Sequence, residues 1–216
     1  MAPPAHPRPR ADSRARTPAR SRPRLSREDW IAAALAALAR SGVDGLRVDV
    51  LARELGATRG SFYWHFADRR ALLIDALEEW RRRSSTELLA RASALDDPVR
   101  QARFLVDEAL DDELAAGLEP ALVAHCADPD VARVTRAVTR ERMAFFASVL
   151  ERMGWPPAEA RRRVVALYAL LLGVLQLRRS VPDLVPESAP DPARRAELLA
   201  LLEPLLTPPP GTGGPA

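Results

Sequence analysis

Lysine is absent from this chain, so all 32 positively charged side chains are arginine. Cysteine is almost absent as well. The single residue Cys126 excludes an intramolecular disulfide and indicates a reducing compartment. The longest apolar run, Val164 to Leu177, falls short of the roughly 20 residues that cross a bilayer, and no apolar signal-peptide segment is recognised. We therefore expect a cytoplasmic protein with no membrane partner.

Aromatic side chains are also scarce, at 5% of the sequence, so the core must be built mainly from leucine, alanine and valine. Alanine and leucine are strong helix formers, while β-branched runs and Asn-Gly turns are nearly missing. A length of 216 residues fits one mid-sized domain or two small ones. The composition predicts an all-α fold.

Positive charge is concentrated at the N-terminus. Residues 1–27 hold eight arginines and one acid, Asp12, whereas the whole chain carries only +3, so the remainder is mildly acidic. This distribution suggests a polyanionic partner at the N-terminal end. Residues 1–24 are rich in Pro, Arg and Ser, and residues 208–216 in Pro and Gly, so both are expected to be disordered tails. The first tail is either a solvated element or a contact to a DNA minor groove or phosphates.

Helix boundaries are clearly marked between the tails. Ser26, followed three residues later by Asp29, predicts a helix start, and Gly42 predicts its end. Asp68 is expected to cap a long helix that reaches about Arg91. Asp-Pro pairs mark three later starts, at 97–98, 128–129 and 191–192. We predict about nine helices, three short ones packed first and six longer ones behind.

Residues 48–66 have the parts of a helix-turn-helix. Ala52 is small where two helices cross, Gly56 permits the turn, and Phe62 and Phe66 stand one helical turn apart. The second helix is predicted from Thr58 to about Phe66. Leu51, Leu55, Phe62 and Phe66 are predicted to face inward.

The remaining side chains of this segment are predicted to face DNA. Thr58 would cap the second helix and, with its free N–H groups, meet a phosphate. Arg59 is suited to guanine O6 and N7, and Gly60 lets the helix start approach closely. Tyr63, Trp64 and His65 are suited to phosphate, sugar and thymine-methyl contacts, and Ser61 also faces outward.

The run Gly-Ala-Thr-Arg-Gly-Ser-Phe-Tyr-Trp-His-Phe at 56–66, followed by Asp-Arg-Arg-Ala-Leu-Leu at 68–73, resembles the TetR family of transcriptional regulators. The resemblance implies a DNA-binding domain at 25–72 and a helical effector-binding and dimerisation domain at 73–207. It also implies that Arg69 grips a phosphate. Arg47 departs from the family pattern, which often has a capping threonine there, so the cap is lost or passes to Asp49 and Arg47 is free to contact phosphate.

Two later segments are apolar over more width than one contact face needs, namely 157–180 and 192–206. We infer a homodimer through these helices, in agreement with the four-helix interface that the resemblance implies. Such a dimer would place two reading helices on the half-sites of a palindromic operator. The helix that begins at Asp68 would be the lever between the DNA-binding end and the ligand.

By resemblance, the helices of residues 96–180 enclose a pocket for a small-molecule effector that relieves repression. Aromatic or polar residues inside aliphatic helices are the pocket candidates, with core filling as the alternative for each: Trp80, Phe104, His125, Phe145 and Tyr168. His125 beside Cys126 has no further ligand at useful spacing, so we expect no metal and no cofactor. Two other hypotheses stay open: a small helical enzyme that uses His125, Cys126 or Tyr168, and a helical interaction module that does not bind DNA.

Overall fold

The computed structural model describes residues 25–111, 113–181, 183, 200, 204, 206 and 207. Residues 110, 111 and 113–116 are described by their backbone only. The described residues contain helices and no strand. The elements are α1 (Arg27–Ser41), η1 (Val43–Gly45), α2 (Val48–Glu54), α3 (Arg59–Tyr63), α4 (Arg69–Arg81), η2 (Arg82–Glu87), α5 (Leu88–Ser93), α6 (Pro98–Asp111), α7 (Glu113–Ala124), α8 (Pro129–Arg152) and α9 (Pro157–Ser180). The all-α prediction is confirmed.

The predicted helix boundaries hold where a cap specifies them. Ser26 and Asp29 form a capping box at the start of α1, and Gly42, with φ of 66°, ends that helix. Asp68 accepts a hydrogen bond from the Ala71 amide at the start of α4, 2.8 Å away. Asp128 caps α8 in the same manner. These ends follow from local chemistry and so could be read from the sequence.

Three details differ from the predictions. First, α1 has 15 residues and is not short. Second, α3 ends at Tyr63 rather than Phe66, and the His65 amide donates to the Phe62 carbonyl three residues earlier, which tightens the last turn. Third, the long helix from Asp68 reaches Ser93 and includes the π-helical stretch η2. The ninth predicted helix, at 192–206, lies outside the described residues apart from three positions, as do both predicted tails.

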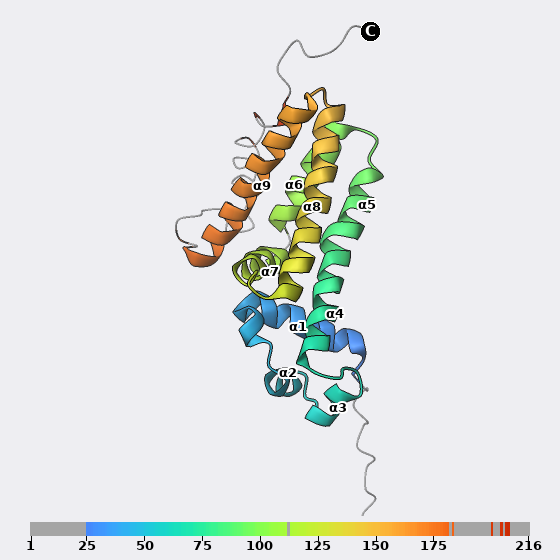
Figure 1. Cartoon of the computed structure of the whole chain (residues 1–216), viewed down its shortest axis with the longest axis vertical. Helices are drawn as coiled ribbons and strands as arrows, with labels where there is room; N and C mark the ends of the chain where they lie inside the picture. Colours follow the sequence, from blue (N-terminus) through green and yellow to red (C-terminus); the bar gives the residue numbers. More distant parts are fainter. Residues whose placement is uncertain are drawn as a thin grey trace, which may run out of the picture.

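The helices form an elongated bundle (Figure 1). α1, α2 and α3 lie at one end with the beginning of α4, while α5, α6, α8 and the first half of α9 occupy the other. α1 packs against α7 and α4, and α8 packs against α9. The continuous α4–η2–α5 helix connects the two ends and runs across the predicted domain boundary at 72/73.

Two apolar clusters fill the interior. The first surrounds Trp30 and extends from α1 to Phe62 of α3, Trp80 of α4 and Val134 of α8. The second lies at the opposite end around Trp155, between α6, α8 and α9. Because the first cluster contains residues of α7 and α8, the helix-turn-helix end shares its core with the body of the protein. None of the described helices has the length and hydropathy to cross a bilayer.

Candidate nucleic-acid interface and internal cavity

The helix-turn-helix is formed by α2 and α3. Gly56, with φ of 63°, supplies the turn in the left-handed region that glycine tolerates best. The Ala57 amide donates to the Ala52 carbonyl at 2.8 Å and closes the turn. Thr58 caps α3 by accepting a hydrogen bond from the Ser61 amide at 3.2 Å. The predicted turn and cap are therefore both confirmed.

Phe62 anchors α3 from beneath. Its side chain is fully buried, and its ring lies edge-on to Trp30 and stacked on Phe66, with centroid distances of 5.4 Å in both cases. Leu51 and Phe66 are buried as predicted, and Leu55 is partly buried. A helix of only five residues is marginal by itself, so this aromatic contact sets where α3 lies.

The opposite side of α3 is open to solvent. Trp64 is 81% exposed and Tyr63 56% exposed, which is unusual for side chains of this size. Thr58, Arg59 and Gly60 are also exposed, and Ser61 and His65 are partly so. Arg59 makes no hydrogen bond or ion pair with any described residue. The structure thus brings seven predicted contact residues together on one surface, which we call the α3 face.

Arg47 and Arg69 have contacts within the protein. Arg47 occupies the N-cap position of α2 without capping it, and its Nη2 lies 3.2 Å from the Asp49 carboxylate. Arg69 donates from Nε to the Leu46 carbonyl at 2.6 Å and from Nη2 to the Val43 carbonyl. Arg69 therefore fastens the loop after α1 to α4, a role that the sequence did not indicate, and its phosphate contact stays a prediction.

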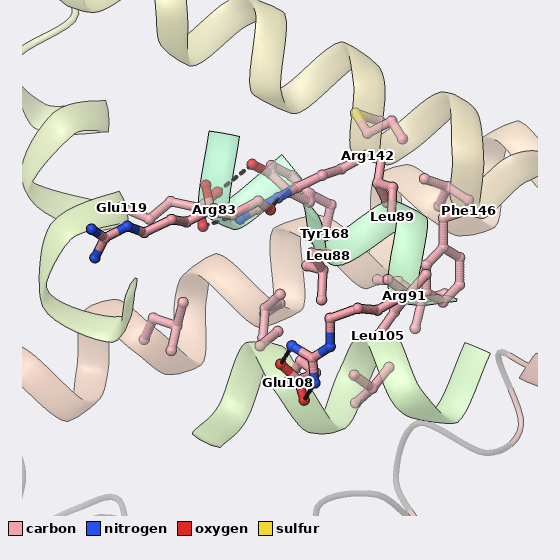
Figure 2. Close-up of a pocket in the computed structure, with 18 of the residues that line it drawn as sticks. Arg83, Leu88, Leu89, Arg91, Leu105, Glu108, Glu119, Arg142, Phe146 and Tyr168 are labelled. Atoms are coloured by element: carbon pink, nitrogen blue, oxygen red, sulfur yellow. Dashed lines mark hydrogen bonds and ion pairs between the residues drawn. The ribbon is translucent and has the colours of Figure 1, made fainter. Parts of the chain in front are cut away.

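A cavity of about 320 Å³ lies in the body of the molecule, walled by η2, α5, α6, α7, α8 and α9 (Figure 2). Most of its lining is aliphatic, with Phe146 and Tyr168 as its aromatic members. The volume lies within the range of about 300–1,000 Å³ that is typical of small-molecule sites. Tyr168, one of the predicted pocket residues, lines this cavity.

The other four predicted pocket residues do not line this cavity. Trp80 belongs to the first core cluster, and Phe145 packs on the second. The ring of Phe104 lies 4.9 Å from a guanidinium of α5. His125 lies beside Gly42 at the end of α1, where its Nδ1 is 2.7 Å from the Ala121 carbonyl. The sequence shows which aromatic or polar side chains are rare in an aliphatic helix. It does not show which face of the helix carries them.

Two charged residues that the sequence analysis missed lie at one end of the cavity. Arg142 of α8 donates from Nη1 to Glu119 of α7 at 2.7 Å, and Tyr168 donates its hydroxyl to the same carboxylate. Glu119 is only 3% exposed. Burial, together with the neighbouring Glu119 charge, raises the pKa of Tyr168 to about 12. The available signal was a lone carboxylate in the otherwise apolar run Leu118 to Leu122.

The π-helical stretch η2 is held by α8. Arg142 donates from Nε to the Ser84 carbonyl at 2.8 Å. The neighbouring Glu141 accepts from the Ser85 hydroxyl at 2.6 Å and pairs with Arg81. π-helical turns are rare and frequently occur at functional sites. Ser84 also lines the cavity, so the irregular turn forms part of the cavity wall.

The α3 face, the helix-turn-helix and the all-helical body together define a class, the helix-turn-helix transcriptional regulators. Residues 31–76 match the family model described as bacterial regulatory proteins, tetR family. The class D tetracycline repressor of Escherichia coli is 46% identical over 68 residues, which are 32% of this chain and 28% of the repressor. The aligned part thus spans little more than a quarter of that relative's length.

Solved structures extend the likeness to most of the chain. A transcriptional regulator from Rhodococcus sp. Rha1 is 25% identical, with a TM-score of 0.64 over 86% of this chain and 100% of that one. A protein described as a transcriptional regulator from Saccharomonospora viridis, solved in complex with choline, has a TM-score of 0.69 at 17% identity over 82% and 95%. The second likeness concerns the fold alone. The N-terminal part of this chain is therefore similar to the tetR family of bacterial regulatory proteins, and the described chain as a whole shares the fold of solved transcriptional regulators.

Proposed function

We propose that this regulator is a repressor that binds a palindromic operator as a homodimer and releases it when a small molecule binds. The single observation that carries the DNA-binding part is the α3 face, where Trp64 and Tyr63 are open to solvent while Phe62 is buried beneath them. Large exposed aromatic side chains on a short capped helix are favourable only when a partner covers them. A DNA major groove admits a helix of this kind.

Six of the seven residues of the α3 face have a proposed role. Arg59, unpaired within the described part of the chain, reads guanine O6 and N7, and Thr58 with the first amides of α3 meets a phosphate. A Cβ on Gly60 would have no neighbour nearer than 3.7 Å, so the protein itself does not need glycine there and close approach to DNA explains it. Tyr63, Trp64 and His65 contact phosphate, sugar or thymine methyl groups.

We propose that α9 forms the dimer interface together with residues 192–206, which lie outside the described part of the chain. Among the exposed apolar side chains of α9 are Leu170 and Leu177, which are seven residues apart and therefore lie on one face of the helix, and Val165 nearer its start. A Cβ added at Gly173 would meet nothing within 4 Å of described structure, so a partner helix has room to approach there. A symmetric dimer then presents two α3 faces to the two half-sites.

The cavity is the proposed effector site, and the α4–η2–α5 helix is the proposed lever. Its upper part forms a wall of the cavity, and its first turn is joined through Arg69 to the loop that precedes α2. An effector that binds more tightly to one arrangement of this helix shifts the population toward it. The Saccharomonospora viridis structure contains choline, which supports small-molecule binding by this fold without identifying the effector of this chain.

Operator binding by Arg59→Ala tests the proposal. DNA fragments selected from the source genome with the unaltered protein would supply the operator. Arg59→Ala should then weaken binding by about 1–3 kcal/mol and relax the base preference at one position. Arg100→Ala on α6, also exposed, is the matched control and should keep both affinity and preference. Equal effects of the two variants, or no enriched sequence, would contradict DNA reading and favour the non-DNA-binding module.

A further inference from the structure

Every charged side chain in the cavity wall already has an oppositely charged partner. Arg91 pairs with Glu108 at 2.7 Å, and Arg142 pairs with Glu119 at 2.7 Å, both within the wall (Figure 2). The remaining two wall charges pair with side chains just outside it, Arg83 with Glu79 and Glu87 with Arg82. A charged ligand would therefore enter an apolar space without an unpaired counter-ion, which is costly.

The most buried ion pair of the wall, Arg142 with Glu119, leaves one donor unused. The Arg142 guanidinium uses Nε for the Ser84 carbonyl and Nη1 for Glu119, while Nη2 makes no hydrogen bond within the described part of the chain. Both Glu119 oxygens are already engaged, one by Arg142 and the other by Tyr168. At the Arg142–Glu119 pair the cavity thus offers a hydrogen-bond donor and no unengaged carboxylate oxygen.

We propose that the cavity takes an uncharged, mainly apolar ligand with one hydrogen-bond acceptor, such as an ester, lactone or ketone, and that Arg142 receives this acceptor. The aliphatic wall covers the body of the ligand, and the guanidinium donates to its carbonyl oxygen. Fatty acids and amines of the same length bind less well, because each brings a charge that the paired wall does not neutralise.

The same guanidinium connects the bound ligand to the α4–η2–α5 helix. Arg142 holds the π-helical stretch η2 through the Ser84 carbonyl, so a ligand that repositions the guanidinium acts directly on this hydrogen bond. The conversion of a π turn to a regular α turn rotates the following residues relative to the preceding ones. This step rests on the proposed function, because it takes the cavity as the effector site.

A matched probe series tests the ligand class on the full chain without DNA. Methyl octanoate, octane, octanoate and octylamine share one alkyl chain and differ in charge and acceptor, and titration calorimetry near pH 8 keeps the last two charged. Methyl octanoate should bind about ten-fold or more tightly than octane, as expected for a hydrogen bond to a charged donor. It should also bind at least about ten-fold more tightly than either ion. Tighter binding of octanoate or octylamine, an ester no better than octane, or no binding of any probe would overturn the proposal.

Two variants test whether Arg142 is the reason that methyl octanoate binds more tightly than octane. The double variant Glu119→Gln with Arg142→Met removes the pair without leaving a lone buried charge, and it should bind ester and octane alike. Tyr168→Phe is the control: it loses one donor to Glu119 but keeps Arg142, so the advantage of the ester should remain. If the double variant still binds the ester more tightly than octane, the proposed role of Arg142 is overturned. If that variant does not fold, the comparison of probes on the unaltered protein still decides the ligand class.

Failure of this inference is distinguishable from failure of the proposed function. Operator binding by the unliganded protein requires no ligand in the cavity, whereas the probe series contains no DNA. A chain that binds its operator but prefers a charged probe keeps the proposed function and loses the inference. A chain that prefers the ester but binds no operator loses the proposed function and keeps the ligand class.

Discussion

The anchor beneath α3 allows the stability and the DNA affinity of this end of the molecule to be separated. Phe62 is fully buried between Trp30 and Phe66, while Trp64, two residues later, is 81% exposed. Truncation of a buried phenylalanine to alanine typically costs about 3–5 kcal/mol, and each aromatic pair adds about 0.5–1.5 kcal/mol that is partly contained in that figure. We therefore expect Phe62→Ala to lower the free energy of unfolding by about 3–5 kcal/mol.

This loss is large against a total stability of about 5–15 kcal/mol for a typical domain. Urea unfolding followed by circular dichroism measures it. Phe62→Leu retains most of the buried volume and should cost about 1–2 kcal/mol. Trp64→Ala removes only exposed surface, so its unfolding free energy should stay within about 0.5 kcal/mol of the unaltered protein, even though operator affinity falls. The reasoning is refuted if Phe62→Ala costs less than about 1 kcal/mol, or if Trp64→Ala costs as much.

Three further predictions concern single contacts. Hydrogen bonds from Arg82 and Arg83, outweighing partial burial, lower the pKa of Glu79 from 4.5 to about 2. The ionised carboxylate therefore adds stability above about pH 4.5 that is lost as the pH falls toward 2. Unfolding measured across this range should depend less on pH in Glu79→Gln, and an unchanged dependence would count against the shift. Gly42→Ala should lower the melting temperature, because φ is 66° and the new Cβ would meet the ring of His125; a melting temperature equal to that of Gly60→Ala would argue otherwise. Thr58→Ala should lose a cap worth about 0.5–2 kcal/mol and weaken operator binding, whereas Thr58→Ser should retain both; equal behaviour of the two variants would exclude the cap.

The sequence was most informative where structure is set by neighbouring residues. The caps at Ser26, Thr58 and Asp68 each need only one side chain and an amide two or three residues later, so their positions could be predicted. The inward placement of Phe62 and the outward placement of Trp64 likewise follow from helical spacing within one short segment.

The cavity could not be predicted in the same way. Its polar end joins Glu119, Arg142 and Tyr168 from three different helices, and their meeting depends on how α7, α8 and α9 rotate about their axes. The residues of η2 carry no glycine or proline that would mark an irregular turn, and the side chains that hold it come from α8, more than 50 residues away. Long-range packing of this kind leaves no periodic signal in a single sequence.

If the cavity is the effector site, as proposed, arginine side chains are the contacts that would connect the helix-turn-helix end to it. Arg27 donates to the backbone just after α3 and pairs with α4. Arg69 donates to the first carbonyl of η1 and to the carbonyl that follows η1. Arg179 of α9 joins the backbone of α1 to that of α7. A carbonyl accepts these bonds whatever side chain its residue carries, so the contacts fix the position of the main chain itself. The first two ties make α1, α2 and α3 follow the first turns of α4 as one unit. A displacement of η2 is therefore expected to reach the α3 face as a rotation of this whole unit, which alters the spacing of the two reading helices in a dimer while the structure of each is preserved.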